Sequence, residues 1–190
     1  MALLFAAAIA THILLVAGLR NPTVRTRYEA VRELLTAYGL SDFHETLLEL
    51  LGATHIGPEQ ALRHLATLTE SIDATAGAPQ TQFAFAADLT AVARPIAIDG
   101  SRETIARGLH REAMFWIGVT HSRCWKVLSQ GPRGDLTQRF EDNYGALAED
   151  LGIFGFAAVR RRCSEIERAL PEVCEVAERM IAANREIEDD

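Results

Sequence analysis

The sequence is poor in cysteine and almost free of lysine, and it lacks the short motifs that mark cofactor and metal sites. Its three cysteines lie far apart and form no CxxC pair, so neither a disulfide framework nor a cysteine zinc site is expected. It contains no GxGxxG fingerprint, P-loop, GxSxG elbow, HExxH pair or Glu-x-x-His pair. We therefore expect no cofactor and no metal, and we expect each cysteine to be a small buried hydrophobic side chain.

Basic residues are outnumbered by acidic ones. The 19 Lys and Arg residues stand against 26 Asp and Glu residues, which gives a net charge of −7. Nucleic-acid binding needs a basic face that contacts phosphates, so we expect no nucleic-acid partner. Lys126 is the only lysine, and this preference for arginine, together with abundant alanine, is typical of a high-GC genome.

The chain does have enough apolar residues for one folded domain. Of its 190 residues, 48% are hydrophobic and 24% are charged, which is the composition of a globular protein. A chain of this length buries about 70% of its unfolded surface, so it needs no disulfide or structural metal to fold. No repeat or linker divides the sequence, and we expect a single domain over residues 1–190.

Helical periodicity recurs along most of the chain. Apolar residues spaced three to four apart alternate with helix-ending glycines and helix-starting prolines, such as Gly39, Gly52 and Pro58. This pattern predicts an all-α fold, a single bundle of about seven to nine helices. The period weakens over residues 74–100, which we expect to be one long irregular segment, and such segments often carry function. We expect helices to begin after it at Ser101 and, near the C-terminus, at Pro171.

The first helix is apolar almost throughout. Between Ala2 and Leu19 only Thr11 and His12 are polar, a stretch close to the length of about 18 residues at which a helix begins to span a bilayer. Alanine is only weakly hydrophobic, and no basic residue precedes the stretch, so a secretory signal is not expected. We expect residues 1–20 to pack in the bundle or at an oligomer interface, with a membrane anchor as the less favoured alternative. The expected protein is a cytoplasmic homo-oligomer, in its simplest form a dimer.

A strong helix over residues 111–129 carries the first set of candidate site residues. If it starts one residue earlier, His110 and His121 lie on one apolar stripe, and a histidine there can act as a general base. A core histidine with one hydrogen bond is the alternative for His121. The two histidines are about 16 Å apart along the helix, so they cannot share a metal.

A neighbouring stripe of the same helix carries Glu112, Trp116, Thr120 and Arg123 at steps of three and four residues. A carboxylate, a hydroxyl and a guanidinium beside an indole can hold a polar ligand. A solvated helix edge is the alternative interpretation.

The irregular segment supplies the second set of candidates. Asp99 and Ser101 flank an expected helix start, where unpaired backbone amides attract an anion. Arg94 precedes a proline, which holds it extended, and it is able to point into a cleft. The alternative is a structural salt bridge in which Arg94 or Arg102 pairs with Asp88 or Asp99.

Three stretches resemble the helical region of actinobacterial proteins related to nucleotidyltransferases: ARPIAIDGSRETI (93–105), HREAMFWIGVTHSRCWKVL (110–128) and VAERMIAANREIED (176–189). The resemblance covers the chain from about residue 21 onward. It implies a helical bundle that, in such proteins, follows the catalytic domain and helps to bind the substrate. The Gly-Ser loop and the aspartate pair that hold Mg²⁺ and the triphosphate are missing here. The resemblance therefore implies the helical half alone, which does not transfer nucleotides by itself.

Two functional hypotheses follow from these residues. In the first, the bundle binds a small polar-aromatic metabolite of a bacterial pathway. Binding is either its whole function or the first step of a cofactor-independent isomerisation, cyclisation or elimination. In the second, the chain is a non-catalytic partner, either in a homodimer or bound to a separate nucleotidyltransferase-type protein. The first hypothesis assigns catalytic roles to His121, Asp99 and Glu112, and ligand binding to Arg94, Trp116, Trp125, Asp88, Ser101 and His110.

Overall fold

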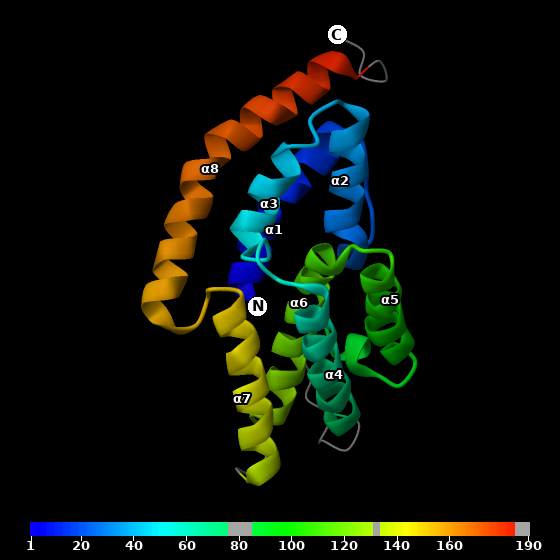
Figure 1. Ribbon diagram of the computed structural model, residues 1–190, viewed down its shortest axis with the longest axis vertical. Coiled ribbons are helices and arrows are strands. Elements are labelled where there is room, and N and C mark those ends of the chain that lie inside the picture. The colour runs from blue at the N-terminus through cyan, green and yellow to red at the C-terminus, as the bar shows by residue number, and fades with distance from the viewer. Residues whose placement is uncertain (76–84, 131–133, 185–190) are drawn as a thin grey trace.

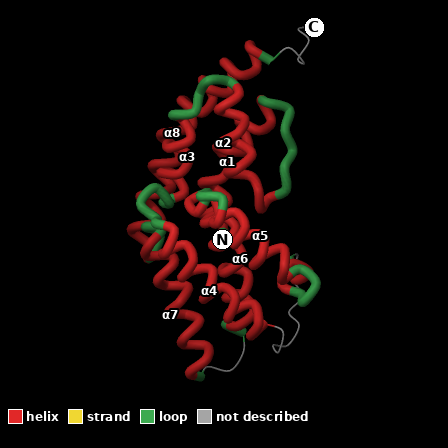
Figure 2. Tube along the Cα trace, turned by 45° about the vertical axis from the view of Figure 1, so that its right-hand side comes forward, coloured by secondary structure: helices red, strands yellow, loops and turns green. Residues whose placement is uncertain are grey.

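The computed structural model describes residues 1–75, 85–130 and 134–184, and the regular structure in these ranges is helical (Figures 1 and 2). The all-α prediction is confirmed, and the described ranges contain no strand. The residues in these ranges form eight α-helices and two short 3₁₀ helices: α1 (Ala2–Ala17), η1 (Val24–Thr26), α2 (Arg27–Ala37), α3 (Phe43–Leu51), α4 (Pro58–Thr75), η2 (Ala86–Leu89), α5 (Arg94–Ala106), α6 (His110–Leu128), α7 (Asp135–Asp150) and α8 (Gly155–Ala183).

Helix α6 lies at the centre of the molecule. Every residue from 112 to 124 is buried, because α4, α5 and α7 pack against it and α1, α2 and α3 reach its N-terminal part. In Figure 1, α4 to α7 form the lower half of the view, and α1 to α3 lie in the upper half. The ring of Phe115 joins the two halves, since it contacts Phe5 edge-on at 5.8 Å and Tyr28 at 5.3 Å between centroids. This helix therefore places its polar side chains in the interior.

Helix α1 is a packed helix with one uncovered side. Its buried side, which includes Leu4, Ala8 and Leu15, contacts α8, α2 and α3. Its other side leaves Ile9, His12 and Val16 exposed. Among the described residues, no helix has the length and apolar character needed to cross a bilayer.

The irregular segment is shorter than the sequence analysis predicts. Residues 76–84 lie outside the described ranges, and α5 already begins at Arg94, with Pro95 in its first turn, where the fixed φ of proline suits a helix start. Ser101 therefore lies inside α5, and its hydroxyl donates to the carbonyl oxygen of Ala97 at 2.6 Å. The predicted helix start at Ser101 is wrong. The anion site expected on the backbone amides there is lost with it, because those amides bond within the helix.

Helix α8 is continuous where the sequence analysis predicts two helices. Pro171 lies inside it rather than at its start, and α8 curves along the outside of the molecule (Figure 1). Proline has no N–H to donate to the preceding turn, which permits such a bend. Cys163 and Cys174 are exposed on this helix, against expectation, whereas Cys124 is buried as predicted.

Candidate functional site

The side chains of Glu112, Trp116, Thr120 and Arg123, which we call the α6 stripe, are all buried. Their spacing of three to four residues places them on one side of α6. The alternative of a solvated helix edge is therefore wrong. One end of the stripe meets α2 and α3, and the other meets η2.

Arg123 lies over two aromatic rings at the η2 end of the α6 stripe. Its guanidinium carbon is 4.5 Å from the ring centroid of Phe85 and 5.0 Å from that of Trp116. Its Nη1 donates to Oδ2 of Asp88 at 2.5 Å. Burial lowers the pKa of Arg123, and the Asp88 carboxylate opposes this shift. Two residues predicted to bind ligand, Trp116 and Asp88, are thus brought together, and Arg123 joins them.

Three polar atoms of the α6 stripe are buried without a hydrogen-bond partner in the part of the chain that the structure describes. They are Nε1 of Trp116, Oγ1 of Thr120 and Nε of Arg123. A buried polar group left unpaired costs about 1–3 kcal/mol, so native proteins rarely leave several close together. The three residues span about 10 Å along the helix axis. Such a group of donors is suited to a ligand that supplies acceptors.

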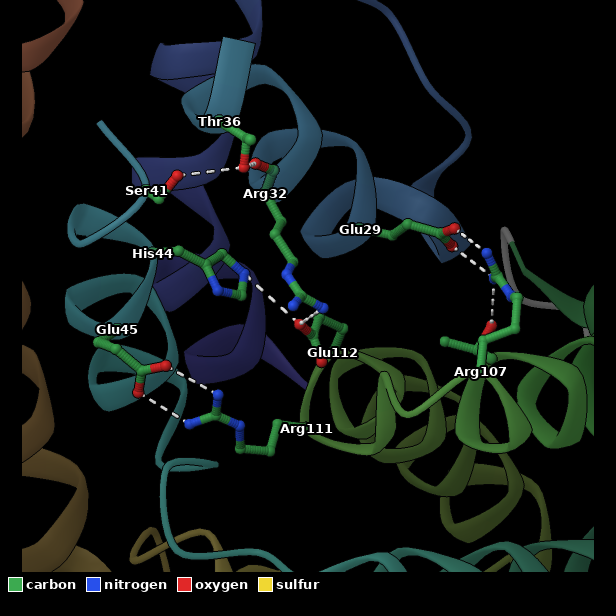
Figure 3. A network of polar contacts seen from close by, with 10 residues as sticks. Glu29, Arg32, Thr36, Ser41, His44, Glu45, Arg107, Arg111 and Glu112 are labelled. Carbon is green, nitrogen blue, oxygen red and sulfur yellow. Dashed lines mark hydrogen bonds and ion pairs between the residues drawn. The ribbon is translucent and has the colours of Figure 1, made fainter. Parts of the chain in front are cut away.

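Glu112 marks the other end of the α6 stripe, where α2 and α3 converge on it (Figure 3). Nη1 of Arg32 donates to its Oε1 at 3.3 Å. Nε2 of His44 lies 3.9 Å from the same oxygen, beyond hydrogen-bond distance, and finds no partner among the described residues. Burial lowers the pKa of His44, although the Glu112 carboxylate opposes the shift, so the imidazole is neutral at pH 7. Beside them, Arg111 forms a two-bond pair with Glu45.

His44 is a site residue that the sequence analysis missed. Acidic residues near His44 in the sequence favour a helix face that is exposed to water. Its signal is positional, since His44 lies three, four and seven residues before Leu47, Leu48 and Leu51, which are buried on the inner side of α3. That spacing indicates an inward-facing histidine.

His121 lies on a different side of α6 from the α6 stripe. It is two residues from Arg123, which is about 200° of rotation around a helix. Its Nε2 is 3.2 Å from Oγ1 of Thr67, and its ring lies against Tyr144 at 6.4 Å between centroids. Burial lowers its pKa to about 4, and His64 adds to the shift. This is the geometry of the core histidine that the sequence left open as an alternative.

The residues predicted in and after the irregular segment lie on the surface, apart from Ser101. Asp99 pairs with Arg102 at 2.6 Å, which is the structural salt bridge of the alternative interpretation. Arg94 forms a two-bond pair with Asp73 of α4 at 2.6 and 3.0 Å, so its partner is neither Asp88 nor Asp99. Of the remaining candidates, His110 and Trp125 are both half-buried on α6.

Two further features bear on possible sites. A hollow of about 430 Å³ lies between α2 and the segment that follows α1. None of the predicted site residues lines it. Its lining residues are Arg20, Asn21, Pro22, Ala30, Glu33, Leu34 and Ala37. Among the residues of the described ranges, no group of three or more His, Cys, Asp or Glu side chains is placed to hold a metal ion.

Comparison of the chain with protein-family models, with curated proteins and with solved structures finds no match. The resemblance to the helical region of nucleotidyltransferase-related proteins therefore stays a prediction.

Proposed function

We propose that this protein binds a small polar-aromatic metabolite at the α6 stripe, with Trp116, Thr120 and Arg123 as the residues that contact it. The observation that carries this proposal is the set of three buried polar atoms that lack partners within the described ranges, all on one side of one helix. The indole and the guanidinium offer N–H donors, and the hydroxyl offers a donor and an acceptor. A planar compound with oxygen substituents satisfies all three.

A proton-transfer step at the same site is a further part of the proposal. Glu112 lies one helical turn from Trp116, about 6 Å along the axis. Its carboxylate and the neutral imidazole of His44 offer a base and a second proton carrier within 3.9 Å of each other. We assign acid–base chemistry to this pair rather than to His121, because His121 points to another side of α6. Isomerisation, cyclisation and elimination need no more than such a pair and a shaped site.

Native mass spectrometry of the purified protein tests the binding proposal. The wild type is expected to carry one small compound per chain, which is identified after denaturation. The variants Trp116→Phe and Thr120→Val each remove one hydrogen-bonding group, and each is expected to lower the affinity about tenfold.

The matched control is Trp125→Phe. Position 125 is nine residues from Trp116, half a turn around the helix, so this variant is expected to retain the compound. The binding proposal is wrong if the wild type carries no compound and no member of a panel of small aromatic compounds raises its melting temperature.

A second candidate function, assembly as a homodimer, is supported by the uncovered side of α1. Ile9 and Val16 are each about half exposed there, as is Leu19 just after the helix, and the exposed polar residue His12 lies between Ile9 and Val16 in the sequence. Exposed apolar side chains on one side of a helix favour a protein–protein contact. Dimerisation and ligand binding are compatible, because the uncovered side of α1 does not include the buried α6 stripe.

A further inference from the structure

The geometry points to an aromatic carboxylate as the ligand of the α6 stripe, in competition with the side chain of Asp88 for the Arg123 guanidinium. This inference rests on the proposed function, since it names the ligand class for the same residues. Asp88 then acts as an internal carboxylate that occupies part of the position of the ligand's own carboxylate.

The aromatic rings around Arg123 determine how a ligand approaches it. Phe85 and Trp116 each lie within 5.0 Å of the guanidinium carbon. The N–H bonds of a guanidinium lie in its own plane, so it offers them along its edge. A planar carboxylate is the group that pairs with that edge through two parallel hydrogen bonds.

The Arg123–Asp88 pair uses only part of this edge. Other arginines of the chain hold their carboxylates with two bonds each. Arg94 uses Nε and Nη2 on Asp73, and both Arg107 on Glu29 and Arg111 on Glu45 use their two terminal nitrogens. Arg123 instead makes one bond, from Nη1 to Asp88, and its Nε is buried without a partner in the described part of the chain. A ligand carboxylate that takes the place of Asp88 is able to make the second hydrogen bond to the guanidinium that Asp88 does not make.

The two partners of this pair differ strongly in exposure. The Arg123 side chain is 3% exposed, whereas the Asp88 side chain is 41% exposed. Asp88 is therefore able to turn into solvent and be hydrated there, while Arg123 stays in place. The exchange of one carboxylate for another then needs no rearrangement of α6.

Charge balance excludes a neutral ligand in this exchange. A buried guanidinium left without a counter-charge is strongly destabilised. The other acidic residue of the α6 stripe, Glu112, is eleven residues away, about 16 Å along the axis, and it already contacts Arg32. A compound that displaces Asp88 must therefore bring its own negative charge, and Trp116 Nε1 and Thr120 Oγ1 are available to its remaining oxygens.

Calorimetric titration with benzoate and with its neutral analogue benzamide tests the inference. Benzoate is expected to bind the wild type, and Asp88→Asn is expected to bind it at least tenfold more tightly because the internal competitor is gone. The control Asp73→Asn removes the carboxylate of the exposed pair with Arg94 and is expected to leave the affinity for benzoate unchanged. Equal affinity of the wild type and Asp88→Asn for benzoate would overturn the inference.

Nuclear magnetic resonance of the wild type provides a second measurement that does not depend on the folding of Asp88→Asn. The Nε–H resonance of Arg123, assigned by its loss in Arg123→Lys, is expected to shift with benzoate and to stay in place with benzamide. Equal shifts with both compounds refute the carboxylate but leave the binding proposal intact. No shift with either compound refutes the inference, and the binding proposal then fails only if native mass spectrometry also finds no bound compound.

Discussion

Two buried histidines of this protein, His64 and His121, have different hydrogen-bond partners. Nε2 of His64 is 2.7 Å from a carboxylate oxygen of Asp150. Burial alone would raise the pKa of Asp150, but hydrogen bonds from Gln60 and His64 outweigh it, so the pKa is lowered. His121 instead contacts the hydroxyl of Thr67, a neutral group, and its pKa is about 4. His121 therefore resists protonation in the folded state.

The low pKa of His121 predicts a loss of stability in mild acid. In the unfolded chain its imidazole takes up a proton as the pH falls through 6.5, whereas in the folded protein it stays neutral until the pH is about 4. The free energy of unfolding therefore decreases across this window, by about 2 kcal/mol between pH 7 and pH 5. Urea unfolding at the two pH values measures the difference.

His121→Gln is expected to reduce this pH dependence, because glutamine does not titrate. His12→Gln, which replaces an exposed histidine of α1, is expected to keep the wild-type slope. An unchanged slope in His121→Gln would show that another group causes the acid sensitivity.

Two glycines with positive φ form a matched pair for a test of close packing. Gly39 has φ +70 and open space where a Cβ would stand, whereas Gly52 has φ +84 and a Cβ there would overlap the carbonyl oxygen of Leu151. Gly39→Ala should lose about 1 kcal/mol of unfolding free energy from backbone strain alone. Gly52→Ala should lose roughly 3 kcal/mol or more, because steric overlap adds to the strain. Chemical denaturation of both variants measures the losses, and equal losses would contradict the close contact.

At the scale of helices, one buried side chain joins the ends of two of them. Arg162 of α8 donates hydrogen bonds to the carbonyl oxygens of Glu49 and Leu50, at the end of α3, and of Leu151, which follows α7. The last carbonyls of a helix have no partner within the helix, and a cation near them is favourable. Arg162 thus links α3, α7 and α8 at a single point.

Removal of this link should destabilise the fold. Arg162→Met keeps much of the apolar stem but leaves three carbonyl oxygens without their donor, and it is expected to cost about 3 kcal/mol. Arg161→Met, at an exposed position beside it, should cost less than about 0.5 kcal/mol. Thermal unfolding of both variants measures the difference, and similar melting temperatures would mean that water replaces the guanidinium at the helix ends.

The helix boundaries show where local sequence signals are sufficient and where packing overrides them. Pro58 and Gly52 start and end helices as predicted, because the signal and the backbone requirement lie at the same residue. Pro171 is equally suited to a helix start, yet α8 passes through it. Ile166 before it and Val173 and Met180 after it, at steps of seven, are all buried, in a helix that packs on α1. The periodicity across the proline was thus the stronger signal.

At the scale of the whole molecule, the sequence predicts the fold class but only half of the candidate site. The spacing on α6 suffices to group Glu112, Trp116, Thr120 and Arg123, because one helix fixes their relative positions. The groups that other helices bring to them, such as His44 of α3, depend on long-range packing that local periodicity does not encode. The sequence therefore predicts the α6 stripe but not most of the residues from other helices that contact it.

The uncovered side of α1 allows a prediction about the oligomeric state of the protein. If two copies pair through this side, Val16→Glu places a charge in the contact and should convert a dimer to a monomer without unfolding it. Ala2→Glu, at an exposed position near the helix start, is the milder control. Light scattering after size-exclusion chromatography measures the mass, and a wild-type monomer at high protein concentration would refute this contact.

The complete burial of residues 112–124 in α6 also limits which substitutions this protein tolerates. On a surface helix such as α8, tolerated substitutions should recur with each turn, as one side is exposed to solvent. Over residues 112–124 no side is exposed, so a saturation mutagenesis profile should be uniformly intolerant there, without helical periodicity. Sequence divergence is then confined to the outer helices, and remote relatives should be recognisable by this central segment when the rest of the chain no longer aligns.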